Sequence, residues 1–189
     1  MAYKEKKIYN KATQHSIKFI QTKSETFGRF LEMEATYGAH SNEPAEHYHP
    51  YQTEEFTILS GKLSVRINGQ ISVLTQGEKL YIPANTVHSM WNDTDNETVV
   101  NWKVEPALDT EYFFETLYGL ANDGKTNGEG RPAFLQTIIT ARKFANVFRL
   151  SKPSYFIQQM AFGLLAPVAY LFGYRSVYKK YFEFITDND

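Results

Sequence analysis

Residues 47–61 read HYHPYQTEEFTILSG, and residues 77–92 read GEKLYIPANTVHSMWN. His47 and His49 are two residues apart, so in an extended strand both imidazoles project from the same face of a sheet. Glu54 begins an alternating run that ends at Gly61, which places its carboxylate at the head of a strand, within reach of the histidines. His88, in the second stretch, is the third candidate imidazole. These two stretches predict a metal site assembled inside a β structure.

The predicted ligands are three imidazoles and one carboxylate. This set suits Mn, Fe, Co, Ni, Cu or Zn better than Ca or Mg, which prefer shells made only of oxygen. Four protein ligands leave positions open for water or substrate, as in a catalytic or ligand-binding site. Two alternatives remain: the barrel keeps the motif without a metal, or Glu55 replaces Glu54. The parity of the strand turns Glu55 away and favours Glu54.

The two stretches resemble the paired motifs of the cupin superfamily over roughly residues 15–105. The first motif is matched by His-Tyr-His, four residues, Glu, six residues and Gly; the second is matched at Gly77, Pro83, Asn85, His88 and Asn92. The resemblance departs from the family in a longer spacer between Gly38 and His47, and in Asn85 at a position where the family has Gly. Asn tolerates the left-handed conformation that such a turn needs.

The resemblance implies a mainly β protein with a double-stranded β-helix (cupin, or jelly-roll) barrel. It also implies one divalent transition metal ion (Fe, Mn, Ni, Cu or Zn) near one end of that barrel. The ligands implied are His47, His49, Glu54 and His88. Cupins include dioxygenases, isomerases, decarboxylases, sugar-binding regulators and storage proteins, so the family alone does not specify a reaction.

The chain is expected to form a barrel domain over residues 1–106 and a helical extension over residues 107–189. Short strand-like runs follow one another up to residue 104, and Asn68-Gly69 between two of them is typical of a type I′ hairpin turn. After Pro106 the apolar period becomes helical, first over about 109–120 and then from Pro132 to Phe148. We expect the extension to pack on the barrel or on a partner subunit.

Residues 155–174 (YFIQQMAFGLLAPVAYLFGY) are apolar almost all round and about as long as a membrane span. Gln158 and Gln159 lie inside this stretch, and Gly163 and Pro167 interrupt it. We therefore expect a buried helix and no membrane span, with a peripheral membrane contact as the alternative. A fourth segment, from Tyr174 to Ile185, has amphipathic spacing.

Composition excludes other classes of function and site. A net charge of −1 and a pI near 6.5 argue against a nucleic-acid-binding face. The absence of cysteine excludes disulfides and thiolate ligands. The polar N-terminus, MAYKEKKIYNKATQ, has no apolar core typical of a secretory signal, so a cytoplasmic protein is expected.

The leading hypothesis is a metal-dependent enzyme acting on a small organic molecule, with dioxygenase-like chemistry favoured over isomerisation. No cluster of Arg or Lys meets the motifs, so an aromatic or enol-like ligand is expected before a phosphorylated sugar. Met33, Tyr51, Met90 and Trp102 are candidate pocket residues, with plain core packing as the alternative. The rival hypothesis is a non-enzymatic small-molecule-binding or sensor protein. The aromatic share of 15% favours a homodimer.

Overall fold

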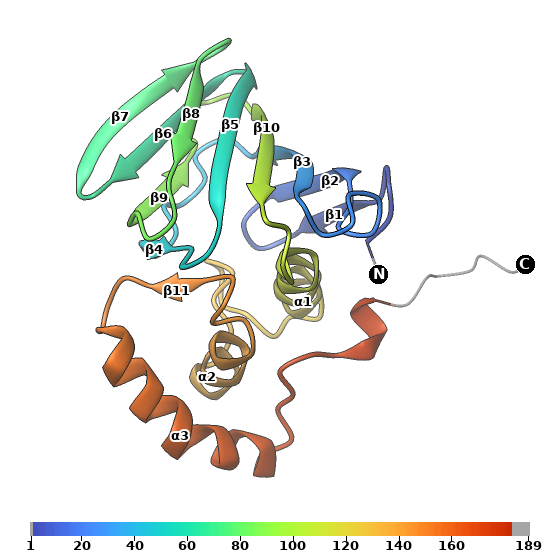
Figure 1. The fold of residues 1–189 in the computed structure, drawn as a ribbon, viewed down its shortest axis with the longest axis vertical. Coiled ribbons are helices and arrows are strands. Elements are labelled where there is room, and N and C mark those ends of the chain that lie inside the picture. Colours follow the sequence, from blue (N-terminus) through green and yellow to red (C-terminus); the bar gives the residue numbers. More distant parts are fainter. Residues whose placement is uncertain (1, 183–189) are drawn as a thin grey trace, which may run out of the picture.

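The structure is a computed structural model that describes residues 2–182, and its chain folds into a β domain followed by a helical tail (Figure 1). The strands are β1 (Lys7–Asn10), β2 (His15–Gln21), β3 (Leu31–Tyr37), β4 (His47–Tyr48), β5 (Thr53–Ser60), β6 (Lys62–Ile67), β7 (Gln70–Thr75), β8 (Lys79–Ile82), β9 (His88–Trp91), β10 (Thr98–Glu105) and β11 (Arg149–Leu150). The helices are α1 (Thr110–Asn122), α2 (Phe134–Lys143), α3 (Tyr155–Leu171) and the 3-10 helix η1 (Lys179–Tyr181).

Two antiparallel sheets form the β domain. Their strand orders are β1-β2-β3-β10-β5-β8 and β11-β4-β9-β6-β7. Residues alternate between buried and more exposed positions along the central strands; Val100, Trp102 and Val104 of β10 are buried, whereas Asn101 and Lys103 are less so. This alternation buries one face of each sheet against the other. The predicted jelly-roll barrel with a C-terminal helical part is confirmed.

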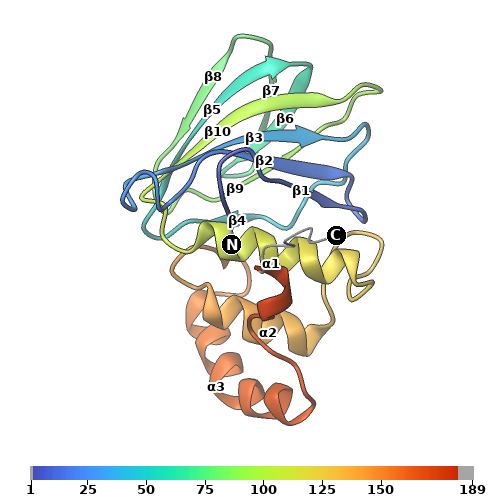
Figure 2. The same cartoon turned by 90° about the vertical axis from the view of Figure 1, so that its right-hand side faces the viewer.

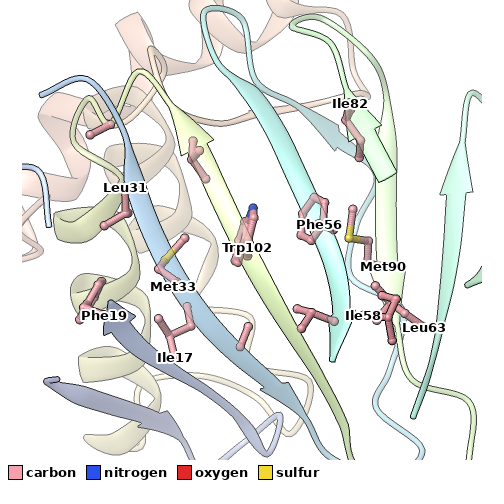
Figure 3. Packing of buried hydrophobic residues seen from close by; sticks show 14 of the residues in the cluster. Ile17, Phe19, Leu31, Met33, Phe56, Ile58, Leu63, Ile82, Met90 and Trp102 are labelled. Atoms are coloured by element: carbon pink, nitrogen blue, oxygen red, sulfur yellow. The ribbon is translucent and has the colours of Figure 1, made fainter. Parts of the chain in front are cut away.

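The core between the sheets is built from inward-facing side chains of both (Figure 3). Trp102 of β10 lies opposite Met33 of β3 on one side and Phe56 of β5 on the other. The Phe56 and Trp102 rings stack with centroids 5.3 Å apart. Met90 of β9 contributes from the second sheet. The interior is therefore apolar and aromatic, except at the end where the histidines lie.

The turns follow the backbone preferences of their residues. Asn68 and Gly69 both have positive φ, 49° and 84°, as the predicted type I′ hairpin between β6 and β7 requires. Asn85 also has a positive φ of 65°, so the turn before β9 survives the replacement of Gly by Asn. The Asn85 backbone N–H donates to the His49 carbonyl, 2.9 Å away, which ties this turn to the first motif.

The tail lies against one end of the barrel in successive layers, with α1 nearest the sheets, α2 beyond it and α3 outermost (Figure 2). Polar contacts join α1 to the first strands. Lys6 pairs with Glu115 at 2.6 Å, and the Tyr118 hydroxyl hydrogen-bonds His15 Nδ1. None of the helices within residues 2–182 combines the length and apolarity needed to cross a bilayer.

The tail differs from its expected helices in three places. The helix expected to be buried, α3, exposes large apolar side chains along one face, including Leu164 at 70%. The predicted helical face reaches Phe148, but α2 ends at Lys143 and the chain then turns into β11, which pairs with β4. Phe144 and Val147 in this turn are fully buried, so tertiary packing overrides the helical period. The fourth segment is helical only at η1 among the described residues, and Ile185 lies outside them.

Candidate metal centre

Two short strands and the loop after β4 bring the histidines together at one end of the barrel. His47 of β4 lies opposite His88 of β9 in an antiparallel pair, and their ring centroids are 4.5 Å apart. His49 follows two residues after His47, and its ring centroid lies 5.2 Å from that of His47 and 5.3 Å from that of His88. One ligand nitrogen from each of the three lies within 4.8 Å of the other two.

Backbone carbonyls fix the orientation of all three imidazoles. Nδ1 of His47 lies 3.1 Å from the Ala45 carbonyl, Nδ1 of His49 lies 2.6 Å from the Val147 carbonyl, and Nδ1 of His88 lies 2.9 Å from the Thr86 carbonyl. A carbonyl can only accept, so each Nδ1 carries a proton, and Nε2 is the nitrogen whose lone pair a neutral imidazole offers to a metal ion. Metal-binding histidines are held in the same way in proteins.

Glu54 supplies the carboxylate from the start of β5, where its side chain is 1% exposed. Its Oε1 lies 3.3 Å from His49 Nε2, and its Oε2 lies 3.0 Å from His88 Nε2. Glu55, the rival carboxylate, is exposed on the outer face of the same strand. Strand parity therefore places Glu54, and not Glu55, beside the histidines.

Trp102 orients this carboxylate. Its indole Nε1 donates to Glu54 Oε1 at 3.0 Å, and its ring is 8% exposed. Sequence reasoning placed Trp102 in the pocket wall but did not identify this hydrogen bond. The bond leaves Glu54 Oε2 directed at the histidines.

The electrostatics of the centre keep Glu54 ionised and two imidazoles neutral. Burial raises the pKa of Glu54, but the interactions with His49 and with the hydrogen-bonded His88 outweigh burial and bring this pKa to about 2. Burial lowers the pKa of His47 and His49. Burial also opposes the charged form of His88, but the adjacent Glu54 carboxylate raises the pKa of His88 above its usual value.

The helical tail covers the centre. The Phe148 ring stacks on the His47 ring with centroids 4.5 Å apart and an interplanar angle of 25°, and it also stacks on Phe113 of α1. Val147, which accepts from His49, precedes it in the same turn. Neither residue was predicted at the site, because both come from a segment about a hundred residues away in the chain.

The other candidate residues divide into two groups. Met33 and Met90 are buried in the core between the sheets. Met33 lies on the same face of its sheet as Trp102 of the neighbouring strand β10, and Met90 lies on the same face of β9 as His88. The Tyr51 side chain is 61% exposed, and its ring lies 5.7 Å from the Arg149 guanidinium. Asn92 has a structural role, since its amide donates to the Tyr37, Gly38 and Asn96 carbonyls.

Two surface hollows, of about 310 and 410 Å³, lie away from the centre. The first is lined by residues such as Lys23 and Glu111, and the second by residues such as Lys125 and Tyr178. Neither includes a site histidine.

The residues present fit a divalent transition metal ion. His49 Nε2 is buried and has no hydrogen-bond partner among the described residues, and Glu54 Oε2 is buried with the His88 ring nitrogen 3.0 Å away. A buried polar atom without a partner costs about 1–3 kcal/mol. A cation among these atoms would satisfy both, and the imidazole and carboxylate donors match the preference of Fe, Mn, Ni, Cu or Zn. The same arrangement can bind a ligand at the open positions of such an ion.

The chain is similar to known proteins over its β domain. A family model described as the Cupin domain matches residues 33–103. Quercetin 2,3-dioxygenase from Bacillus subtilis strain 168 is 35% identical over 100 residues, which cover 53% of this chain and 29% of that protein. The chain thus spans less than a third of the length of this curated relative.

Two solved structures are similar to this chain over about half of its length. KdgF from Halomonas sp. matches 51% of this chain and 83% of its own at 14% identity and a TM-score of 0.44. A sugar phosphate isomerase from a cupin superfamily, from Silicibacter pomeroyi, matches 53% of this chain and 70% of its own at 16% identity and a TM-score of 0.45.

Proposed function

Because the chain belongs to the cupin superfamily through its β domain, we propose that it is a metal-dependent enzyme with dioxygenase-like activity on a small organic molecule. In this proposal His47, His49, His88 and Glu54 hold one divalent transition metal ion. The observation that carries the proposal is the shared orientation of three imidazoles whose Nδ1 atoms all point at backbone carbonyls. Such an ion, when bound, supplies Lewis acidity and, if it is Fe, Mn, Ni or Cu, oxygen chemistry.

The protein's own residues prepare the site. Three carbonyls hold the imidazole tautomers, and the Trp102 indole holds one oxygen of Glu54 so that the other faces His88. Phe148 shields the His47 ring from water on one side. Exclusion of water strengthens electrostatic interactions at the centre and protects reactive species there.

The lining favours an apolar ligand. Met33, Phe56, Met90 and Trp102 fill the barrel interior beyond the histidines, and no Arg or Lys is among the buried residues of the described range 2–182. A phosphorylated substrate would need such cations. The proposal therefore names an aromatic or enol-like molecule, in agreement with the chemistry in the name of the Bacillus subtilis relative.

Metal content of the purified full chain, measured by elemental analysis, tests the site. The expected result is close to one transition metal ion per chain, with loss of the metal in His88→Ala and weaker retention in Glu54→Gln. Glu55→Gln is the matched control, since it makes the same change one residue away on the exposed face of β5. Metal-free protein that takes up no Mn, Fe, Ni or Zn, or equal effects of both Gln variants, would overturn the proposed ligand set.

Oxygen consumption with the restored metal tests the reaction, with quercetin and simpler aromatic diols as probes. Turnover that disappears in His88→Ala supports an oxygenase. A chain that retains its metal and binds such a probe without consuming oxygen would instead be the alternative, a non-enzymatic binding or sensor protein. The stacking of Phe148 on His47, which covers one side of the centre, is the observation that favours this second candidate.

A further inference from the structure

Helix α3 has two apolar faces, and only one of them is packed. Phe162, Ala166 and Ala169 are buried against α2. The opposite face carries large apolar side chains that are exposed to solvent, including Leu164 at 70% and Leu171 at 86%. The outer-face residues are Phe156, Ile157, Met160, Leu164, Val168 and Leu171. From Ile157 onward these residues are three or four positions apart, and Phe156 lies next to Ile157, so together they form one stripe along the helix.

This stripe is unlike the solvent-facing side of an ordinary helix. All 17 residues of α3 are uncharged, whereas a helix side that faces water normally carries charged residues. The helix is also the outermost element of the molecule, on the side away from the barrel (Figures 1 and 2). A continuous exposed apolar surface of this kind marks a binding face.

Charge around the stripe identifies what binds there. Residues 130–182 contain eight basic and no acidic residues, whereas residues 1–129 contain 12 basic and 18 acidic residues; three acids follow in residues 183–189. Lys152 precedes α3 and Arg175 and Lys179 follow it, all three exposed. Within residues 2–182, Lys152 and Lys179 make no ion pair. Exposed cations therefore lie near both ends of an uncharged helix.

We propose that α3 binds the surface of an anionic lipid bilayer, with its axis parallel to the membrane. The apolar stripe would enter the boundary between headgroups and acyl chains, and the flanking Lys and Arg side chains would contact headgroup phosphates. Phe156 near one end and Tyr170 and Phe172 near the other match the preference of aromatic residues for this boundary. At roughly 1.5 Å per residue, the helix is about 25 Å long, which suits an in-plane orientation.

A second copy of the chain fits the stripe less well. Pairing two such faces would bring together two copies of residues 130–182, which carry eight basic and no acidic residues, and like charges oppose association. Anionic lipid has the complementary charge. The proposal does not depend on the chemistry of the metal centre. The two sites are close in the chain, because β11 comes just before α3 and pairs with β4, the strand that carries His47.

Co-sedimentation of the full chain with lipid vesicles tests the proposal. Binding to phosphatidylcholine vesicles that contain about a third phosphatidylglycerol should be at least tenfold tighter than to phosphatidylcholine alone, and high salt should weaken it. Leu164→Glu combined with Leu171→Glu should reduce binding at least tenfold. Ile71→Glu combined with Val73→Glu is the matched control, because these β7 residues are 56% and 53% exposed on the barrel. Circular dichroism checks that each variant is folded.

A fluorescent label identifies the surface that enters the bilayer. The chain has no cysteine, so Leu164→Cys and Ile71→Cys each accept a single environment-sensitive dye. Anionic vesicles should shift the emission of the dye to the blue at position 164 and leave it unchanged at position 71. Lys152→Gln combined with Lys179→Gln should weaken binding to the anionic vesicles by several-fold.

Three results would overturn the proposal. The first is a wild-type chain that binds neither kind of vesicle. The second is vesicle binding that is unchanged in the double variant Leu164→Glu with Leu171→Glu. The third is a wild-type dimer without vesicle binding that the same double variant converts to a monomer, because the stripe would then be an interface between copies.

Discussion

Acid should weaken the attachment of the tail to the barrel through His15. Nδ1 of His15 is hydrogen-bonded to the Tyr118 hydroxyl of α1, and Nε2 is buried with no hydrogen-bond partner among the described residues. The Tyr37 ring lies against the imidazole with centroids 4.4 Å apart. Burial lowers the pKa of His15 from 6.5 to about 4, because the charged imidazolium loses its favourable hydration there.

The sign and size of the effect follow from this shift. In the unfolded chain His15 gains a proton below pH 6.5, whereas in the folded chain it stays neutral down to about pH 4. The unfolded state therefore binds more protons in this window, and the free energy of unfolding decreases as pH falls. At roughly 1.4 kcal/mol per pKa unit, the loss across the window is about 3 kcal/mol.

Urea unfolding of wild type and His15→Gln at several pH values between about 7.5 and 4.5 measures this loss. Gln does not titrate, and its side-chain oxygen can accept from the Tyr118 hydroxyl. The metal-site histidines are present in both proteins, so their titration cancels in the difference. The difference in unfolding free energy, wild type minus variant, should fall by about 2–3 kcal/mol over this range. Parallel stability curves would show that His15 protonates equally in both states and would refute the reasoning.

Two further predictions concern the indole beside Glu54 and a crowded glycine. Trp102→Phe removes the indole donor to the carboxylate and should weaken metal retention about 10- to 100-fold in a chelator competition assay. Trp91→Phe, at a partly exposed position, is the control and should leave metal retention unchanged. Equal losses in the two variants would contradict the role of the hydrogen bond. Gly61→Ala should lower the free energy of unfolding by about 3 kcal/mol, because φ is 80° and a Cβ would lie 2.7 Å from Thr98 Oγ1. Gly69→Ala, at a similar φ of 84° with nothing within 4 Å, should cost only about 1 kcal/mol; indistinguishable urea midpoints would count against the crowding.

Local patterns predicted the parts of the molecule that depend on local chemistry. The two-residue period of a strand predicted that Glu54 points inward and Glu55 outward. The Asn68-Gly69 pair predicted a hairpin, and both residues adopt the positive φ that such a turn needs. These features were predictable because sequence neighbours determine them. The ligand roles of the four residues stay a prediction until metal is measured.

The tail's part in the site was not predictable, because it rests on contacts between distant segments. Val147 and Phe148 lie three and four residues after Phe144, a spacing that also fits a continuing helix. The pairing of β11 with β4 is only two residues long and leaves no pattern in the sequence. Only in the folded chain does the Val147 carbonyl meet His49, and only there does Phe148 meet His47.

Because of these contacts, the candidate metal centre includes residues on both sides of the expected domain boundary at residue 106. The barrel supplies the imidazoles and the carboxylate, but the acceptor that fixes the His49 tautomer comes from Val147, beyond that boundary. The Phe148 ring that covers His47 also comes from the tail, and it stacks on Phe113 of α1. A change that moves the tail would therefore free the His49 Nδ1 and expose the His47 ring at once. The helical extension is thus part of the candidate metal centre, and the properties of the ion should depend on both parts of the chain.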